Sequence, residues 1–219
     1  MVVLFDLDGT LVDTWDLYIE AYRRALAPTL GRRPSFDELV ALKPVSELRL
    51  LGRALGEAEL AEGHRRFIEH YAELHGSHFG GVYPGVRAML DALRRDGHRL
   101  GIVTGKSQAA WEVTRQVSNL GPFDVVVTDE AVAAPKPDPA GLELALERLE
   151  AGRGEAIYVG DGIGDAGAAR AAGMGFAAAL WPKAPDERKR FLAEVAALGA
   201  RVALARPAEL VTVLQRSGL

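Results

Sequence analysis

The sequence predicts an α/β protein with a doubly wound parallel-sheet (Rossmann-like) core and a small all-helical cap inserted after the first strand. Two observations support this prediction. Short, nearly continuous apolar runs alternate with helical patterns along most of the chain, and such alternation is typical of parallel sheets with right-handed crossovers. After the first run, however, a long stretch shows helical periodicity without a convincing strand.

Each predicted core strand is an apolar run that ends in polar or acidic residues. Runs of this kind suit strands that are buried on both faces of a sheet. Ligands bind at the carboxyl ends of the strands in such sheets, so we expect Asp6, Thr104 and Asp161 to meet at one crevice. The predicted strands cover residues 2–5, 100–103, 125–127 and 156–159, with weaker ones at 173–180 and 202–205.

Helices are predicted where apolar residues recur on one face. In the core, such patterns cover residues 85–95 and 139–150. The stretch after the first strand carries three more, at residues 15–27, 45–55 and 57–75. The chain is therefore predicted to form an α/β core of residues 1–13 and 82–219 and a helical cap of residues 14–81.

Length and composition restrict the class of protein. A chain of 219 residues suits one main domain with a modest insertion. A net charge of −4 argues against a nucleic-acid binder, because it implies no strongly basic surface. The absence of cysteine excludes disulfides and thiolate metal sites. With neither a membrane-length apolar stretch nor a signal peptide, we expect a cytoplasmic protein without a membrane partner, as a monomer or homodimer.

The strongest chemical signal follows the first predicted strand, where residues 5–11 read FDLDGTL. Asp6 ends a buried strand, so its carboxylate is aimed rigidly into the crevice. Gly9 lets the chain turn after Asp8, which brings a second carboxylate near the first. Two carboxylates in one pocket repel each other unless a cation lies between them, and their pKa values are driven apart. One can then attack while the other donates or accepts a proton.

A second acidic pair, Asp161 and Asp165, lies in the glycine-rich sequence VGDGIGD at residues 159–165. Hard divalent cations prefer oxygen ligands, and Mg²⁺ commonly uses one or two carboxylates with water and substrate phosphate. The same segment matches the GxGxxG pattern of dinucleotide-binding proteins. That motif usually opens the first strand–helix–strand unit, and a dinucleotide site would give no role to Asp6 or Asp8.

Two further motifs supply groups for binding an anion. Thr104 and Gly105 follow a predicted strand, where a hydroxyl and free backbone N–H groups can bind phosphate oxygens. Lys136 stands between two prolines, which restrict its backbone. A crevice that holds a carboxylate nucleophile and a phosphoryl group needs a fixed positive charge, and Lys136 can supply it.

These motifs together resemble those of the haloacid dehalogenase superfamily, whose phosphatases carry DxDGT at the end of the first strand. The likeness is greatest to the phosphoglycolate-phosphatase-like and β-phosphoglucomutase-like branch. It runs from Asp6 to Asp165, and the helical insertion matches the small cap of that family. Gly105 stands where the family often has asparagine, so the resemblance leaves the substrate contact at this position unspecified.

The resemblance implies a Mg²⁺-dependent phosphatase that hydrolyses a small phosphorylated metabolite through an aspartyl phosphate. Asp6 would be the nucleophile, and Asp8 the general acid and base. Thr104 and Lys136 would complete the catalytic group, and Gly105 would bind substrate phosphate. The implied metal ligands are Asp6, Asp8, Asp161 and Asp165.

The cap is expected to select the substrate. Lys43 and Arg49 flank a possible turn and helix start, and either could bind a substrate carboxylate or a second phosphate. Arginines on helices more often lie solvated or over apolar surface, so this prediction competes with a structural role. Closure of the cap would exclude bulk water and strengthen the electrostatics of the site.

Two other activities remain open at this level. Sugar-phosphate mutases of the same superfamily share all four motifs, but they use a cap histidine near the hinge where this chain has Tyr18. A phospho-accepting receiver domain of a signalling protein also combines a strand-end aspartate with an acidic pair, a threonine and a lysine around Mg²⁺. Receivers are much shorter, however, and they lack both the DxDGT motif and a helical insertion.

Overall fold

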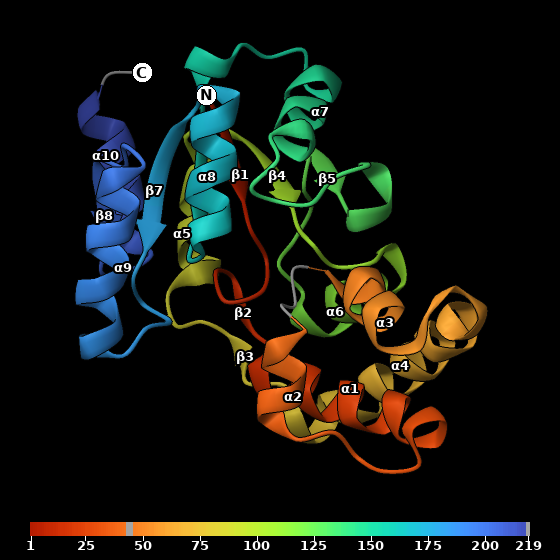
Figure 1. Ribbon diagram of the computed structural model, residues 1–219. Helices are drawn as coiled ribbons and strands as arrows, with labels where there is room; N and C mark the ends of the chain where they lie inside the picture. The colour runs from red at the N-terminus through yellow and green to blue at the C-terminus, as the bar shows by residue number, and fades with distance from the viewer. Residues whose placement is uncertain (43–45, 218–219) are drawn as a thin grey trace.

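The computed structural model describes residues 1–42 and 46–217. Its main feature is a six-stranded sheet with the order β5-β4-β1-β6-β7-β8, in which every neighbouring pair is parallel. Strand β1 lies in the middle of this sheet (Figure 1). The strands are β1 (Val2–Phe5), β4 (Arg99–Val103), β5 (Val125–Val127), β6 (Ala156–Gly160), β7 (Gly175–Ala179) and β8 (Val202–Leu204).

The apolar runs form strands because helices cover both faces of the sheet. Every residue of β1 and of β6 is buried, which explains why these segments show no polar alternation. The predicted strand ends agree with the observed ones to within two residues. The structure therefore confirms the predicted α/β class and the parallel-sheet core.

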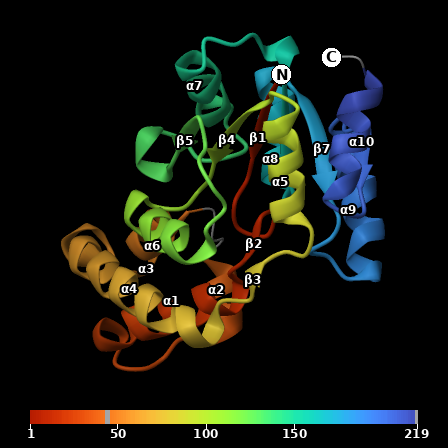
Figure 2. The ribbon, with the colours of Figure 1, turned by 180° about the vertical axis from the view of Figure 1, so that it is seen from behind.

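Two apolar clusters separate the sheet from its covering helices. One contains Leu4 and Tyr158 and joins the sheet to α7 (Ala140–Arg148), α8 (Ile163–Ala172) and α9 (Pro185–Ala197). The other contains Phe5 and Leu100 and joins the opposite face to α5 (Val86–Arg95), α6 (Gln108–Ser118) and α10 (Ala208–Ser217). Figure 1 shows α8 in front of the sheet, and the reverse view in Figure 2 shows α5 and α10 on the other face.

A helical body lies beside the carboxyl ends of the strands, as predicted for the cap (orange in Figure 1). Its own apolar cluster includes Leu17, Phe67 and Tyr71. Its helices are α1 (Trp15–Leu30), α2 (Phe36–Ala41), α3 (Glu47–Leu55) and α4 (Glu57–His78). The longest, α4, is amphipathic, and no helix in the described ranges is long and apolar enough to cross a membrane.

Two short antiparallel strands connect the cap to the core: β2 (Val12–Asp13) pairs with β3 (Gly81–Val82). Figure 2 shows them between the two parts of the molecule. The periodicity of the sequence does not reveal strands of two residues, and they were not predicted. They lie at the predicted junctions near residues 13 and 82, although the division into residues 1–13 with 82–219 and residues 14–81 stays a prediction.

Helix α2 was also absent from the sequence prediction, because six residues are too few to show a clear period. The sequence feature that could have indicated this helix is a capping box at its start. The Ser35 hydroxyl accepts a hydrogen bond from the Glu38 N–H, and the Glu38 carboxylate accepts one from the Ser35 N–H. Helix α3 starts at Glu47 after the N-cap residue Ser46, whereas the predicted start at residue 45 lies outside the described residues.

Candidate active site

Asp6 is aimed into the site by the central strand of the sheet. Its N–H donates a hydrogen bond of 2.9 Å to the Val159 carbonyl, which continues the pairing of β1 with β6 beyond the end of β1. Its Oδ1 lies 2.9 Å from Lys136 Nζ. The nucleophile predicted from the sequence therefore stands on rigid backbone, with a cation in direct contact.

Lys136 contacts two carboxylates and a tyrosine. Besides Asp6, its Nζ lies 2.7 Å from Asp165 Oδ1 and donates to the Tyr158 hydroxyl at 3.0 Å. Burial works against the ammonium form, but the charges of Asp165 and Asp6 raise the pKa of Lys136 well above its usual value. Lys136 therefore keeps its positive charge at every physiological pH. This position agrees with the role predicted for Lys136, namely to neutralise charge in the crevice.

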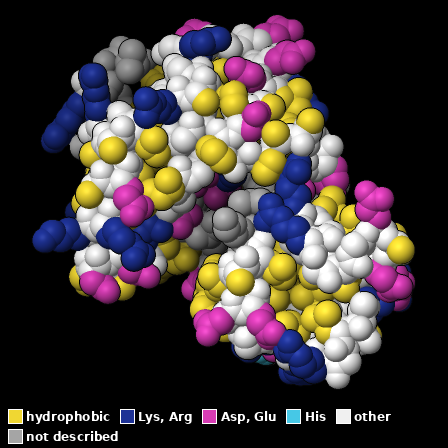
Figure 3. Space-filling model, in the orientation of Figure 1, with side chains coloured by type: hydrophobic (Ala, Val, Ile, Leu, Met, Phe, Trp, Pro, Cys, Tyr) yellow, Lys and Arg dark blue, Asp and Glu magenta, His cyan; other side chains and the backbone are white. Residues whose placement is uncertain are grey.

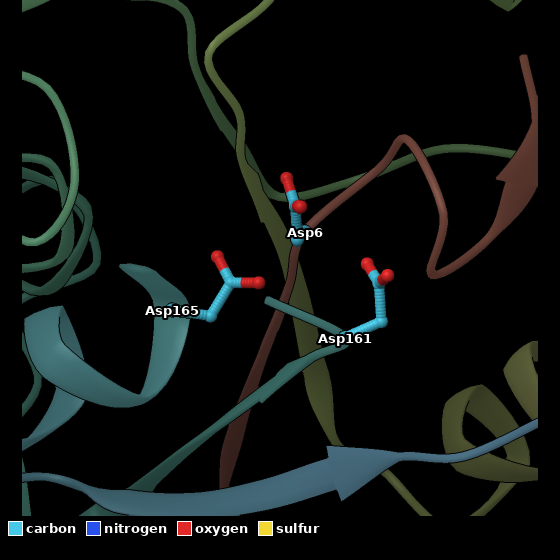
Figure 4. A group of neighbouring side chains, drawn as sticks. All are labelled: Asp6, Asp161 and Asp165. Carbon is cyan, nitrogen blue, oxygen red and sulfur yellow. The ribbon is translucent and has the colours of Figure 1, made fainter. Parts of the chain in front are cut away.

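Asp6, Asp161 and Asp165 form a cluster of three carboxylates (Figure 4). Each can offer one oxygen, and these oxygens all lie within 4.8 Å of one another. Burial raises the pKa of Asp6 to about 8, against the lowering effect of Lys136, and the charges of Asp165 and Asp161 add to the increase. The cluster thus carries more negative charge than Lys136 alone offsets.

A divalent cation fits this donor set, because buried carboxylates that repel one another are stabilised when a metal lies between them. Asp6 and Asp161 are candidate ligands, and each of them also contacts a lysine. Asp165 is already engaged: Oδ1 contacts Lys136 and Tyr158, and Oδ2 accepts a hydrogen bond from the Gly162 N–H at 2.9 Å. Its geometry agrees with a role in orienting the site.

Asp161 is held by residues from two other segments. Its Oδ1 accepts a 3.1 Å hydrogen bond from the Thr10 hydroxyl, and its Oδ2 lies 3.2 Å from Lys183 Nζ. The indole N–H of Trp181, a residue without a role in the sequence analysis, donates to the Thr10 carbonyl at 2.9 Å. The segment after β7 therefore supports both the DxDGT loop and a candidate metal ligand.

The glycine of the DxDGT loop makes this approach possible. Gly9 has a φ of +78°, a conformation that residues with a side chain rarely adopt. A Cβ at this position would lie 2.7 Å from Asp161 Oδ1. Gly9 therefore serves two needs at once, the turn after Asp8 and the space for the Asp161 carboxylate.

Asp8 lies in the same cavity as Asp6, but its carboxylate has different partners. Oδ1 accepts a hydrogen bond from the Thr14 hydroxyl at 2.7 Å and lies 3.1 Å from Lys106 Nζ. The Tyr18 hydroxyl lies 3.4 Å from Oδ2. Among the described residues, the carboxylate cluster that could hold a metal does not include Asp8, and its predicted role as a metal ligand stays a prediction.

A cavity of about 280 Å³ opens between the core and the cap. Its core end is formed by the predicted site residues Asp6, Asp8, Thr104, Gly105, Lys136 and Asp161. Its cap side is mostly aromatic and aliphatic, with Trp15, Tyr22 and Leu50 among the lining residues. Figure 3 shows the surface hollowed where the two parts of the molecule meet. The polar end has groups that can bind phosphate, and the opposite wall offers an apolar surface.

The two cap residues predicted to bind substrate have different outcomes. Arg49 donates from Nη2 to the Ala133 carbonyl at 2.7 Å, and its Nε lies 3.9 Å from Asp129 Oδ1. These contacts link α3 to a core loop, and Arg49 does not line the cavity. Lys43 lies outside the described residues. Substrate binding by either residue stays a prediction.

Sequence reasoning missed several residues that shape the site, above all Lys106 and Glu47. Lys106 directly follows Thr104 and Gly105, but a buried lysine looks the same in a sequence as a solvated one. Glu47 sits in the first turn of α3, a common position for a solvated acid. Both are almost fully buried, which neither composition nor periodicity indicates.

Comparisons with known proteins show the family of the chain. A family model described as haloacid dehalogenase-like hydrolase matches residues 3–179. A phosphoglycolate phosphatase of Cupriavidus necator is 37% identical over 179 residues, which are 78% of this chain and 77% of that protein. The pyrophosphatase PpaX of Bacillus velezensis is 36% identical over 183 residues, 82% of each chain.

Solved structures give the same result. The crystal structure of CbbY from Rhodobacter sphaeroides in complex with phosphate has a TM-score of 0.80 to this chain, with 26% identity and 95% of each chain covered. The match includes the helical cap as well as the sheet, so the interpretation as a receiver domain is wrong. The chain belongs to the haloacid dehalogenase-like hydrolases and is an enzyme of their phosphatase type.

Proposed function

We propose that this protein is a Mg²⁺-dependent phosphatase that hydrolyses a small phosphorylated metabolite through an aspartyl phosphate on Asp6. The observation that supports it best is the position of Asp6. Its carboxylate ends the central strand, contacts Lys136 at 2.9 Å and belongs to a cluster of carboxylates suited to a divalent cation. Family membership supports phosphate ester hydrolysis as the reaction.

In the first step, an oxygen of Asp6 attacks phosphorus in line with the leaving group and forms an acyl phosphate. Lys136, the Thr104 hydroxyl and the Gly105 N–H stabilise the charge on the phosphoryl oxygens. A bound Mg²⁺ would be held by Asp6 and Asp161 and would supply further neutralisation of phosphoryl charge. All of these groups are attached to ends of the central strands or the loops after them, so their geometry is preorganised.

Asp8 provides the proton chemistry of both steps. As the bond from phosphorus to the leaving group breaks, Asp8 donates a proton to the departing oxygen. In the second step it accepts a proton from the water that attacks the acyl phosphate, and inorganic phosphate is released. The two aspartates lie two residues apart, both before the turn at Gly9, and their carboxylates contact different lysines, Asp6 with Lys136 and Asp8 with Lys106, so one can bond to phosphorus while the other serves the leaving group.

Tyr18 argues against the mutase alternative. It occupies the position near the hinge expected for a mutase histidine, with its hydroxyl 3.4 Å from Asp8 Oδ2. Burial raises the pKa of Tyr18 well above its usual value, and the charges of Asp8 and Glu47 raise it further. A tyrosine with so high a pKa cannot exchange protons near neutral pH as a histidine does. We therefore propose hydrolysis rather than isomerisation.

The test is phosphate release from a panel of small phosphomonoesters that includes 2-phosphoglycolate and sugar phosphates. We expect multiple turnovers with Mg²⁺ and loss of turnover when a chelator removes the metal. The ranking of esters would then show which leaving group fits the apolar wall of the cavity. Isomerisation of a hexose phosphate without phosphate release would instead establish a mutase, and release that survives chelation would contradict the metal requirement.

Mg²⁺ affinity is expected to rise with pH, because the pKa of Asp6 is raised to about 8 by burial and by neighbouring carboxylates. Below that pH, Asp6 holds a proton in the metal-free protein, and the metal must displace it. Displacement of one proton strengthens binding by up to about tenfold per pH unit between pH 6 and 8. Calorimetric titration with Mg²⁺ at several pH values measures this effect.

The matched control is Asp6→Asn, which removes the competing proton and should flatten the pH dependence over the same range. Titrations in buffers with different ionisation enthalpies count the protons released. An affinity that stays constant from pH 6 to 8 in the wild-type protein would show that Asp6 does not compete for the ion.

A further inference from the structure

A lysine without a role in the mechanism above is buried at the junction of cap and core. The Lys106 side chain has no exposed surface. It comes from the core loop after β4, and its Nζ lies 3.1 Å from Asp8 Oδ1. A buried ammonium group is costly unless its charge and its donors are satisfied. The groups that contact Lys106 therefore indicate its role.

Most of these partners belong to the cap. Nζ donates to the hydroxyl of Tyr18 at 2.6 Å and to that of Tyr71 at 2.7 Å. It also lies 4.3 Å and 4.6 Å from the ring centroids of the same two tyrosines, within the range of cation–π attraction. One core carboxylate and two cap tyrosines thus surround a single core cation.

Glu47 adds a second link between the two parts. This cap carboxylate is 1% exposed and lies 4.0 Å from Lys106 Nζ. It accepts hydrogen bonds from the hydroxyl of Tyr18 and from the hydroxyl and N–H of Ser107, the core residue after Lys106. The interface is therefore a connected network of buried polar groups rather than a simple apolar contact.

We propose that Lys106 is a positioning residue that holds the Asp8 carboxyl group in place for proton transfer and does so when the cap is docked. This inference rests on the proposed phosphatase function. Lys106 Nζ lies 3.1 Å from Oδ1 of Asp8, and the Thr14 hydroxyl donates to the same oxygen. Oδ2 has the longer 3.4 Å contact with the Tyr18 hydroxyl, so we assign Oδ2 as the oxygen that carries the transferred proton. The acid is thereby fixed through one oxygen and acts through the other.

Docking of the cap and placement of the acid are coupled through the same ammonium group. If the cap moves away, Lys106 loses two hydroxyl acceptors and the faces of two rings, while Asp8 remains on the core. Water would then reach the ammonium group and replace the lost partners, so the side chain would no longer be confined beside Asp8. Oδ1 of Asp8 would lose a fixed ion-pair partner. The network therefore favours a fixed Asp8 in the closed state.

The experiment compares two esters that need the acid to different extents. An alkyl phosphate expels an alkoxide, which requires the Asp8 proton as the P–O bond breaks. 4-Nitrophenyl phosphate expels a stable phenolate, which leaves without it. For Lys106→Met we expect kcat/KM to fall by about 10²-fold or more with the alkyl ester and by less than about tenfold with the aryl ester. The ratio kcat/KM covers the steps up to leaving-group departure, so hydrolysis of the acyl phosphate does not obscure the comparison.

A variant in the cap tests the coupling and protects against a Lys106→Met protein that does not fold. Tyr71→Phe keeps the ring and removes one hydroxyl acceptor of Lys106. We expect the same bias between the two esters, at a smaller size, and a double variant whose loss is smaller than the product of the single losses. Thr114→Val is the matched control, because it removes the other partner of the Tyr71 hydroxyl, at 2.9 Å, without touching Lys106.

Lys189→Met, which removes an exposed lysine of α9, controls for the loss of positive charge. Parallel losses with both esters, in Lys106→Met and in Tyr71→Phe alike, would show that Lys106 is merely structural and would overturn the assignment. If the wild-type protein hydrolyses neither ester, the proposed function is wrong and the assignment falls with it. The wild-type measurement thus separates the two failures.

Discussion

Asp6→Asn is expected to abolish phosphate release, with kcat at least about 10⁴-fold below that of the wild-type protein. Asparagine has nearly the same shape as aspartate, but its amide oxygen is a poor nucleophile. The Lys136 contact at 2.9 Å can persist with the amide oxygen as acceptor. The fold should survive, because the change removes a buried charge whose pKa is already raised to about 8, first by burial and then by neighbouring carboxylates.

Two measurements check this prediction. Phosphate release under multiple turnover gives kcat, and acid-quenched reactions with labelled ester show whether phosphate becomes attached to the protein. The wild-type protein should carry label, and Asp6→Asn should not. Asp186→Asn, an exposed change in the first turn of α9, serves as the matched control. Label on the Asp6→Asn protein would show that another residue is the nucleophile.

Lys136→Met should reduce both activity and stability. Lys136 lies 2.9 Å from Asp6 and 2.7 Å from Asp165, and its removal leaves two buried carboxylates without their cation. Breaking a buried ion pair from one side costs about 3–5 kcal/mol of unfolding free energy. Loss of a cation that stabilises the phosphoryl oxygens should lower kcat by about 10²–10³-fold. Chemical denaturation in chelator and steady-state kinetics in Mg²⁺ measure the two effects.

Two further measurements distinguish whether Lys136→Met loses stability through the missing charge or through lost packing. Addition of Asp165→Asn to Lys136→Met should recover part of the lost stability, because one unpaired charge disappears. Mg²⁺ should stabilise Lys136→Met more than the wild-type protein, since the metal replaces the missing positive charge at the same carboxylates. If neither change restores stability, Lys136 contributes mainly through packing against Tyr158, whose hydroxyl lies 3.0 Å from Nζ.

The strand-end residues of the candidate site could be predicted because the end of a buried strand can be recognised in a sequence. An apolar run that ends at Asp6, and another that ends near Asp161, require that these residues reach the same edge of a parallel sheet. The structure places them within one carboxylate cluster. Lys136 was predicted from its motif and from the need for a cation in the crevice rather than from a strand end, because a loop lysine by itself has the sequence pattern of a solvated charge.

The contacts of the cap were not predictable to the same degree. Helical periodicity indicates which residues of α1, α3 and α4 face an apolar core, and it revealed the cap itself. It does not indicate which polar residues of the cap become buried against the core. Glu47 and Tyr71 meet Lys106 across an interface that no local pattern specifies, since the residues are 35 or more positions apart in the chain.

The sequence alone determined the class of fold and the helical insertion, and it predicted which carboxylates meet in the candidate site, because these follow from local hydrophobicity and from short motifs. Only the tertiary structure decided which oxygen of Asp8 is held, which residues support Asp161, and that Arg49 contacts the core rather than the cavity. The physical reason is that hydrogen bonds and ion pairs are directional and short-ranged. Their formation depends on how the cap and the segment after β7 pack against the core. That packing depends on contacts between residues that are far apart in the sequence.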